Sequence, residues 1–416
     1  MPPAFASTPT DTERSVDAPV QQAGPLDGLL VADFSRVLAG PYSTQLMGDL
    51  GATIVKVEGP SGDETRDWAP PERDGVSTYY LGVNRNKRSI TLDLADAGDR
   101  ALAQELARRA DIVIENFKPG GLAKFGLDYA SVRAENPTVI YASISGFGTA
   151  GGATLPGYDL IVQAMSGLMS LTGDADGTPF RSGVSVFDVM TGMQATVGIL
   201  AALNHRNSTG QGQLVQVNLL STALSAMANH SSTYVAGGTV PFRMGNAHPS
   251  LFPYEPLPAS DGDIVIVAAN DPQFLKLATA LGHPEWAEDD RFARTVSRNQ
   301  NREALRPLLV DALSAQTTAQ WFDELTRAGV ACGPINTIDD GVALAERLGL
   351  NPVVQVGDGD AAIPMVRNPI DFSLTPARYL SPPPALGQDA AEIRAWLARP
   401  NSEHAHSPYT ESEYDL

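Results

Sequence analysis

The sequence has 416 residues and only one cysteine, Cys332. A single thiol cannot form an intramolecular disulfide or a four-cysteine zinc site, so both are excluded. The near absence of cysteine favours a reducing compartment, and we expect a cytoplasmic protein. Cys332 has no histidine close to it in the sequence, so we interpret it as a structural residue rather than a catalytic thiol.

Positive charge is also scarce, because 29 Lys and Arg residues face 48 Asp and Glu residues, for a net charge of −19. A protein of this sign repels nucleic acid and anionic membranes, and neither is expected as a partner. No run of apolar residues reaches the ~18 needed to span a bilayer, and the N-terminus lacks the apolar core of a signal peptide. Residues 1–24 and 401–416 are polar, and the second stretch is acidic, so we expect both to be disordered.

Strands and helices are predicted to alternate along residues 25–220. Short apolar runs indicate strands, and the segments between them have helical spacing. The predicted strands are 29–32, 53–57, 89–94, 111–114, 139–143 and 214–217, and the predicted helices are about 41–51, 97–109, 189–205 and 219–234. This alternation predicts an α/β fold with a Rossmann-like parallel sheet covered by helices on both faces.

The chain changes character at residues 236–263, which are rich in Gly, Pro and aromatic residues. A strand at 264–268 and helices at 272–281 and 302–328 are predicted beyond that stretch. We therefore expect a large domain that begins at 25–220, a smaller α+β domain at 221–329, and a return to the large domain at 330–400.

The segment 146–151 (GFGTAG) matches the dinucleotide-binding pattern G-x-G-x-x-G. That mechanism needs the loop to open directly into a helix whose first turn holds a pyrophosphate. Gly152, Thr154 and Pro156 follow instead, so no helix is expected at once. We reject a nicotinamide or flavin site, although an oxidoreductase remains a hypothesis that a nicotinamide absorbance change would revive.

Two loops that follow predicted strands are suited to an anionic ligand, because ligands of open α/β sheets lie beyond the carboxyl ends of the strands. They are 33–41 and 115–125. Ten of the 29 basic residues fall between positions 66 and 124, near these loops. On a helix such residues are expected to be solvated, but Arg36, Lys118 and Lys124 lie in the loops themselves and are candidate ligand contacts.

Seven segments in order along the chain resemble the class III coenzyme A transferases, a family that includes formyl-CoA transferase and carnitine CoA-transferase-like proteins. They are VLAGPYSTQLMGDLGATIVKVE (37–58), NKRSITLDL (86–94), ENFKPG (115–120), ISGFG (144–148), PGYD (156–159), DVMTGM (188–193) and ILAALNHRNSTGQGQLVQVNLL (199–220). The resemblance implies an enzyme that moves CoA from an acyl-CoA thioester to a small carboxylic acid. It also implies a homodimer of two interlocked, ring-like subunits.

The resemblance further implies that Asp188, which opens the D-x-x-T-G segment, is the nucleophile. It would carry the acyl group as an anhydride and CoA as a thioester, with CoA a substrate and with no metal or other cofactor. The residues implied to contact or border CoA are Arg36, Val37, Leu38, Ala39, Leu92, Asn116, Phe117, Lys118, Lys124, Phe125, Tyr158 and Asp159. From the sequence pattern, Asp188 is predicted as a helix N-cap that the helix end keeps ionised, and Asp159 as a cap or supporting acid.

The chain departs from the formyl-CoA enzyme, which has a glutamine where Leu38 stands, a lysine near Pro156 and a run of glycines where this chain has 242–249. These departures argue against formate and oxalate as substrates. Arg243, Asn246 and His248 are hypothesised to contact an acceptor carboxylate instead.

Two alternatives on the same fold remain, an acyl-CoA racemase and a non-catalytic CoA-binding paralogue. Related racemases have a histidine where Tyr158 stands, and a phenol is poorly suited to proton transfer at neutral pH. A mere binder would form no covalent intermediate at Asp188.

Overall fold

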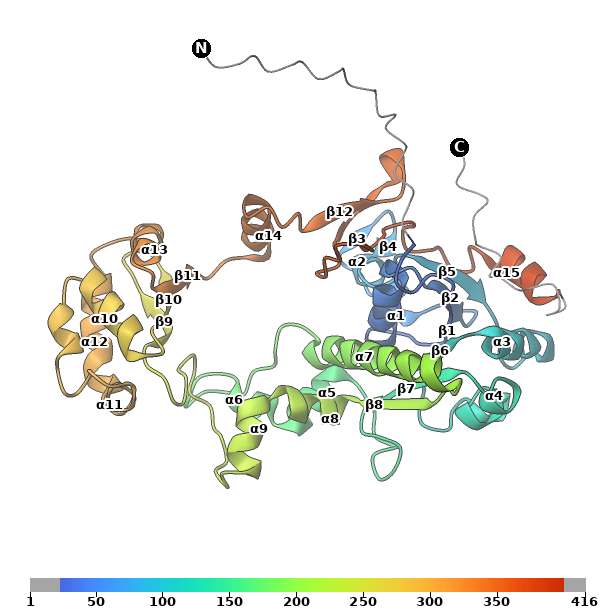
Figure 1. The fold of residues 1–416 in the computed structure, drawn as a ribbon, viewed down its shortest axis with the longest axis horizontal. Coiled ribbons are helices and arrows are strands. Elements are labelled where there is room, and N and C mark those ends of the chain that lie inside the picture. The colour runs from blue at the N-terminus through green and yellow to red at the C-terminus, as the bar shows by residue number, and fades with distance from the viewer. Residues whose placement is uncertain (1–22, 400–416) are drawn as a thin grey trace, which may run out of the picture.

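The structure, a computed structural model, describes residues 23–399 and has a six-stranded parallel sheet in its larger body, on the right in Figure 1. The strand order is β5-β2-β1-β6-β7-β8, and every neighbouring pair is parallel. The strands are β1 (Leu30–Asp33), β2 (Thr53–Glu58), β5 (Lys87–Thr91), β6 (Ile112–Glu115), β7 (Ile140–Ser145) and β8 (Leu214–Asn218). The predicted α/β class with a Rossmann-like parallel sheet is confirmed.

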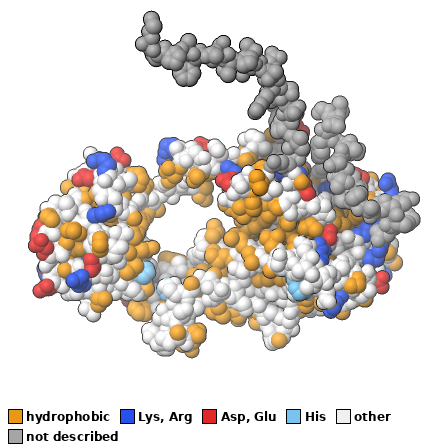
Figure 2. Space-filling view, viewed as in Figure 1, with side chains coloured by type: hydrophobic (Ala, Val, Ile, Leu, Met, Phe, Trp, Pro, Cys, Tyr) orange, Lys and Arg blue, Asp and Glu red, His pale blue; other side chains and the backbone are white. Residues whose placement is uncertain are grey.

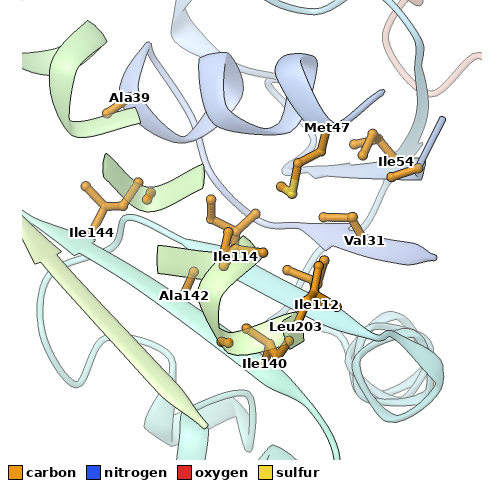
Figure 3. Close-up of a cluster of buried hydrophobic side chains, with 14 of the residues drawn as sticks. Val31, Ala39, Met47, Ile54, Ile112, Ile114, Ile140, Ala142, Ile144 and Leu203 are labelled. Carbon is orange, nitrogen blue, oxygen red and sulfur yellow. The ribbon is translucent and has the colours of Figure 1, made fainter. Parts of the chain in front are cut away.

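Helices cover both faces of this sheet, as the near-continuous apolar strands require. On one face lie α1 (Ala39–Asp49) and α7 (Val186–Thr209), and on the other lie α3 (Ala97–Arg109), α4 (Tyr129–Glu135) and α15 (Ala390–Leu397). Figure 3 shows the core of the first face, where Met47 and Leu203 from the helices meet Val31, Ile112 and Ile140 from the sheet. The predicted helix 97–109 coincides with α3, whose first N–H groups bond to the side chain of Asp96.

A second body has its own sheet and core. Its strands β9 (Tyr254–Pro258), β10 (Asp263–Val267) and β11 (Ala331–Pro334) are antiparallel in the order β11-β10-β9. They pack with η3 (Pro284–Ala287), α10 (Asp271–Ala280), α11 (Thr295–Gln300), α12 (Arg302–Leu313) and α13 (Thr318–Arg327). The single helix predicted at 302–328 is wrong, because Thr317 and Gln320 form a capping box that starts α13 anew.

Two connections join the bodies and leave an opening between them. The outgoing connection contains α8 (Leu219–Ala226) and α9 (Ala228–Val235), and α5 (Asp159–Ser166), which is followed by α6 (Leu168–Leu171), packs against α8. The returning connection contains α14 (Ile338–Arg347) and the hairpin of β12 (Val353–Val356) and β13 (Ile363–Val366). The space-filling view shows that the opening passes between the bodies (Figure 2). The helix predicted at 219–234 is divided, since Ala228 takes a positive φ of 34° between α8 and α9.

The last described residues pack beside the first ones. Arg378 forms an ion pair with Asp27, and the carboxylate of Asp389 accepts the N–H of Ser89 on β5 at 2.8 Å. On α3, Arg109 donates to the carbonyl of Trp396 at 3.1 Å. The segment from 378 onward therefore belongs to the first body, and it closes a ring of chain around the opening.

One prediction about membranes needs correction. Helix α7 has 24 residues and a mean hydropathy of 1.5 in its most apolar window, so by length and composition alone it is able to cross a bilayer. In the structure 44% of that window is buried, with one face packed on the sheet and on α1. A core helix passes the same test, so the finding is weak evidence for a membrane span.

Candidate active site

The loops after β1 and β6, at the carboxyl edge of the sheet, are joined by one side chain. The amide of Asn116 accepts the N–H of Arg36 at 3.0 Å and donates to the carbonyl of Arg36 at 2.7 Å, as a paired strand would. The guanidinium of Arg36 also lies 5.7 Å from the ring centroid of Phe117. Four of the residues predicted to contact CoA (36, 37, 116 and 117) thus form one surface.

Buried cations fix the first loop from beneath. The Lys56 ammonium donates to the carbonyl of Ser35 at 3.1 Å, and that of Lys87 donates to the carbonyl of Pro41 at 2.9 Å. Both lysines are almost fully buried, and Lys87 also pairs with Asp33 at 3.3 Å. The two lysines therefore hold the loop and do not bind ligand.

Much of the predicted basic cluster is similarly occupied. Arg66 pairs with Glu58 at 2.7 Å, and Arg85 pairs with Asp49 at 2.7 Å. By contrast, Lys118 and Lys124 are exposed, and neither has a carboxylate partner within residues 23–399. Arg36 is 57% exposed, with Glu64 at 3.9 Å. In these two loops Lys118 and Lys124 are thus available to an anion, and Arg36 is exposed with a single distant carboxylate partner.

Val37 adopts a conformation that a β-branched residue rarely takes, with φ of 69°. Its N–H is held by both carboxylate oxygens of Asp63, at 3.3 and 3.2 Å. Asp63 was not predicted as a site residue. It is the N-cap of η1 (Glu64–Asp67), where its side chain accepts the N–H of Thr65, and an Asp directly before a helix is a recognisable cap signal. A strained residue held by a buried carboxylate indicates a preset loop.

Three of the predicted CoA contacts have buried side chains. Leu38 is 8% exposed, Ala39 is 2% exposed and Leu92 is 1% exposed. These three residues leave little surface for a ligand in this structure, and their contact with CoA stays a prediction. Phe125 is half-buried beside the Lys124 ammonium, which lies 4.7 Å from the centroid of its ring.

Close packing of α7 on α1 brings Asp188 to the same edge. A Cβ on Gly192 would lie 2.5 Å from the carbonyl oxygen of Ala39, and one turn on, the hydroxyls of Ser43 and Thr196 are 2.9 Å apart. The two helices therefore run in the same direction. Asp188 precedes Gly192 by four residues, about 6 Å along the same face, and so lies over the loop at Arg36.

The sequence pattern predicted Asp188 as the N-cap of its helix, and this prediction is wrong. Helix α7 begins at Val186, with Ser185 in the capping position, so Asp188 is the third helical residue. Its N–H donates to Oδ2 of Asp159 at 3.1 Å. Asp159 in turn is the first residue of α5, with the exposed Tyr158 before it, so Asp159 caps α7 and not its own helix.

The electrostatics of Asp188 also differ from the prediction. Burial raises the pKa of its carboxyl, and the nearby charge of Asp159 raises it further, to about 7. The helix end therefore does not keep the group fully ionised at neutral pH. Burial and Asp188 also raise the pKa of Tyr79, on α2 (Thr78–Leu81), to about 12. Tyr79 was missed, because no pattern in the sequence links it to a residue on α7.

The residues proposed to meet an acceptor acid lie apart from Asp188 within the described part of the chain. Arg243 and Asn246 line a pocket of about 400 Å³ between the loop at 242–247 and α12, and Asp188 is not among its lining residues. Arg243 donates to the carbonyls of Asp174 and Gly177, at 3.2 and 3.0 Å. His248 instead packs against Tyr254, with ring centroids 5.0 Å apart.

The loop that matches the dinucleotide pattern does not open into a helix. A Cβ on Gly146 would overlap the backbone of Gly157, so the glycines close a loop and the next helix, α5, begins only at Asp159. This agrees with the rejection of a dinucleotide site. Within residues 23–399 no cluster of three or more His, Cys, Asp or Glu is arranged to hold a metal.

Residues 26–390 match the family model of CoA-transferase family III. The chain is 43% identical over 388 residues to the succinate–glutarate CoA-transferase of Agrobacterium fabrum, over 90% of this chain and 96% of the relative. It is 39% identical to the acetyl-CoA:oxalate CoA-transferase of Acetobacter aceti, over 92% and 98% of the two chains. A CAIB/BAIF family protein from Brucella suis has a crystal structure with a TM-score of 0.81 and 43% identity, covering 90% of this chain and all of its own (100%).

Proposed function

The chain belongs to CoA-transferase family III, and on that premise we propose that it moves CoA between dicarboxylic acids with Asp188 as the nucleophile. The observation that carries the proposal is the position of Asp188. A carboxyl group with a pKa raised to about 7 lies over the loop at Arg36, and in the neighbouring loop Lys118 and Lys124 have no carboxylate partner within residues 23–399. A raised pKa beside such a surface is typical of a reactive group.

The reaction needs one carboxylate that both attacks and leaves. A carboxylate oxygen of Asp188 attacks the thioester carbon, forming a C–O bond while the C–S bond breaks and CoA departs as the thiolate. The thiolate attacks the Asp188 carbonyl of this anhydride, which releases the donor acid and leaves an aspartyl-CoA thioester. The acceptor carboxylate then attacks that thioester, which releases the thiolate and forms a second anhydride. The thiolate attacks the acceptor's carbonyl in this anhydride, giving the new acyl-CoA and freeing the Asp188 carboxylate. Each step exchanges one acyl bond for another, so no cofactor is required.

Coenzyme A would lie along the joined loops after β1 and β6. Arg36, Lys118 and Lys124 are suited to its phosphates, and Phe117 and Phe125 offer flat apolar surfaces for the adenine. The preset backbone at Val37 would meet the part of CoA nearest the thioester, because Asp188 lies over that loop. Tyr158 is exposed at the start of α5, where it borders the acyl group.

The substrate class rests on the relatives. A protein 43% identical over nearly the whole chain is named for succinate and glutarate, and one 39% identical is named for oxalate, so dicarboxylic acids of about two to five carbons are the expected acceptors. Succinyl-CoA and glutarate are the pair to test first. Oxalate returns as a candidate that the sequence comparison with the formyl-CoA enzyme had disfavoured.

The functional unit that we propose is a homodimer of interlocked rings in the cytoplasm. The opening between the bodies is one support (Figure 2). Another is apolar surface left exposed on the connecting and covering helices, with Val197 on α7 61% exposed and Ile338 on α14 89% exposed. A second copy threaded through the opening would cover such surface, which a lone subunit leaves in water.

The test is to trap the acylated aspartate. The full-length protein is incubated with succinyl-CoA and hydroxylamine, and its peptides are analysed by mass spectrometry. We expect a hydroxamate at Asp188, and we expect Asp188→Asn to lose CoA exchange from succinyl-CoA to glutarate by about 10³-fold or more. Asp323→Asn, an exposed acid on α13, is the matched control and should exchange normally.

Three results would contradict the proposal. Wild-type exchange by Asp188→Asn would exclude Asp188 as the nucleophile. Deuterium exchange at the α-carbon of an acyl-CoA, without any transfer to glutarate, would indicate a racemase. CoA binding with neither reaction would indicate a binding protein.

A further inference from the structure

Helix α7 begins without a cap of its own. Ser185 occupies the capping position but makes no side-chain bond to the helix. The N–H groups of Phe187 and Asp188 donate instead to Oδ2 of Asp159, at 2.8 and 3.1 Å. The donors on either side bond to backbone carbonyls, Val186 to Val184 at 2.8 Å and Val189 to Ser185 at 3.2 Å. Asp159, 29 positions before Asp188, therefore completes the hydrogen bonding of the first turn of α7, which contains Asp188.

Asp159 is itself held in place from α5. Its other carboxylate oxygen accepts from the side-chain amide of Gln163, one turn along the same face. The oxygen of that amide accepts the N–H of Ser182 at 2.8 Å. Asp159 is 6% exposed and Gln163 is 1% exposed, so both bonds are protected from water. Asp159 and Gln163 on α5 therefore hold the segment from Ser182 to Phe187, which leads into α7.

The groups around Asp188 are unbalanced in charge. Asp159 faces it from α5, and Tyr79 faces it from α2. On α1, Ala39 packs against Gly192, one turn beyond Asp188, and the cation of the loop beneath Asp188, Arg36, does not contribute to its pKa. Within residues 23–399 no Lys, Arg or His contributes to the pKa of Asp188. The free carboxylate of Asp188 is therefore opposed by a second carboxylate and compensated by no cation.

From this arrangement we propose that Asp159 is a positioning residue with two effects, aiming Asp188 through the cap and favouring its acylated forms through its own negative charge. The inference rests on the proposed function, because it concerns the same nucleophile. When Asp188 becomes an anhydride or a thioester, its negative charge leaves with the CoA thiolate or with the donor acid. The repulsion from Asp159 is then relieved, so the enzyme favours the covalent states over the free carboxylate.

Asp159→Asn separates the two effects, since the amide oxygen is still able to accept the two N–H groups but carries no charge. The readout is the pH dependence of kcat/KM for succinyl-CoA. Ionised Asp188 is the active form, so loss of the neighbouring charge should move the acidic limb of the profile down by about one pH unit. Asp159→Ala, which also loses the cap, should show the same shift and in addition a lower kcat at all pH values.

A second readout is the covalent intermediate itself. With succinyl-CoA and no acceptor acid, intact-protein mass spectrometry gives the ratio of aspartyl-CoA thioester to free enzyme at pH 8. We expect that ratio to fall about tenfold in Asp159→Asn, which matches a shift of one pKa unit. The control is Asp261→Asn, because Asp261 likewise caps a helix from outside, accepting the N–H of Thr318 on α13 at 2.7 Å. It should change neither readout.

The outcomes are distinguishable. A wild-type protein that forms no covalent adduct overturns the proposed function, and this inference with it. A wild-type protein that forms the adduct, beside an Asp159→Asn variant with the same pH profile and the same adduct ratio, overturns the inference alone. A loss of kcat without either shift would reduce Asp159 to a structural cap and would also overturn it.

Discussion

Asp33 and Asp188 are both acids shielded from water near the carboxyl edge of one sheet, and their surroundings act in opposite directions. Burial by itself raises the pKa of Asp33, but Lys87 and Lys56, with hydrogen bonds from Ser35 and Thr44, hold that pKa below its usual value. Burial raises the pKa of Asp188, and the only charge that adds to it within residues 23–399 is another carboxylate. The first acid is compensated and the second is not.

The comparison separates a structural charge from a reactive one. Asp33 is fully buried, and its partners pin the loop that we propose as the CoA surface. A compensated charge is stable as an ion and has no tendency to form a bond to an acyl group. An uncompensated carboxylate is a stronger base, and esterification relieves it. Neither charge nor burial alone distinguishes the two acids, but the mismatch between them supports Asp188 as the nucleophile that we propose.

Removal of the cation that compensates Asp33 should have the largest effect on stability. Lys87→Met leaves Asp33 buried with one counter-charge fewer, and we expect a loss of about 3–5 kcal/mol in the free energy of unfolding. Chemical denaturation followed by circular dichroism measures it. Arg108→Met, which breaks a partly exposed pair with Glu105, is the control and should cost less than about 1 kcal/mol. Equal losses in the two variants would contradict the comparison.

Removal of the charge of Asp188 should raise the free energy of unfolding, where removal of Lys87 lowers it. The pKa of Asp188 is about 7 in the fold against 3.8 for a free side chain, so its ionisation destabilises the fold increasingly as the pH rises from about 4 to 7. Asp188→Asn should therefore stabilise the protein by about 1–3 kcal/mol at pH 8 and by only about a quarter of that at pH 4.5. Asp33 should show the reverse, because its stabilisation is lost as the pH falls. Denaturation midpoints at both pH values test this.

The same comparison applies to the cations, and here smaller effects are expected. Lys118 and Lys124 are uncompensated like Asp188, so changing either to Ala should raise KM for succinyl-CoA by about 3–10-fold with little change in kcat. The effect should shrink at high salt. Arg133→Ala, an exposed cation on α4, is the control. An unchanged KM in both lysine variants would place CoA elsewhere.

The smallest expected effect concerns the loop between the two acids. Val37→Gly removes the strain of a positive φ, so the fold should gain a few tenths of a kcal/mol, up to about 1. The loop would then lose its preset shape, and KM for succinyl-CoA should rise about twofold to threefold. A variant with weaker stability and unchanged KM would show that the loop is not preset by Val37.

The sheet was predictable because a parallel sheet is buried on both faces and its strands are therefore apolar runs. The strand β9 was missed, since Pro256 and Pro258 break the pattern in a half-buried strand at the edge of its sheet. Asp188 was found through a resemblance, but its cap was misassigned because the capping acid lies 29 residues earlier. The partners of Arg66 and Arg85 were not predictable either, because Glu58 and Asp49 lie on other elements of the fold and no pattern in the sequence links them to these arginines.

The contact between Asp389 and strand β5 has a consequence for synthesis. Strand β5 is the edge of the large sheet, and the segment that bonds to it through Asp389 follows Ser89 by 300 residues. At ribosomal speed that interval is on the order of tens of seconds. During this time the nascent sheet presents a bare edge that is able to pair with any passing strand. A segment translated 300 residues later therefore protects the edge strand β5, and a chain cut before Asp389 should aggregate rather than work slowly.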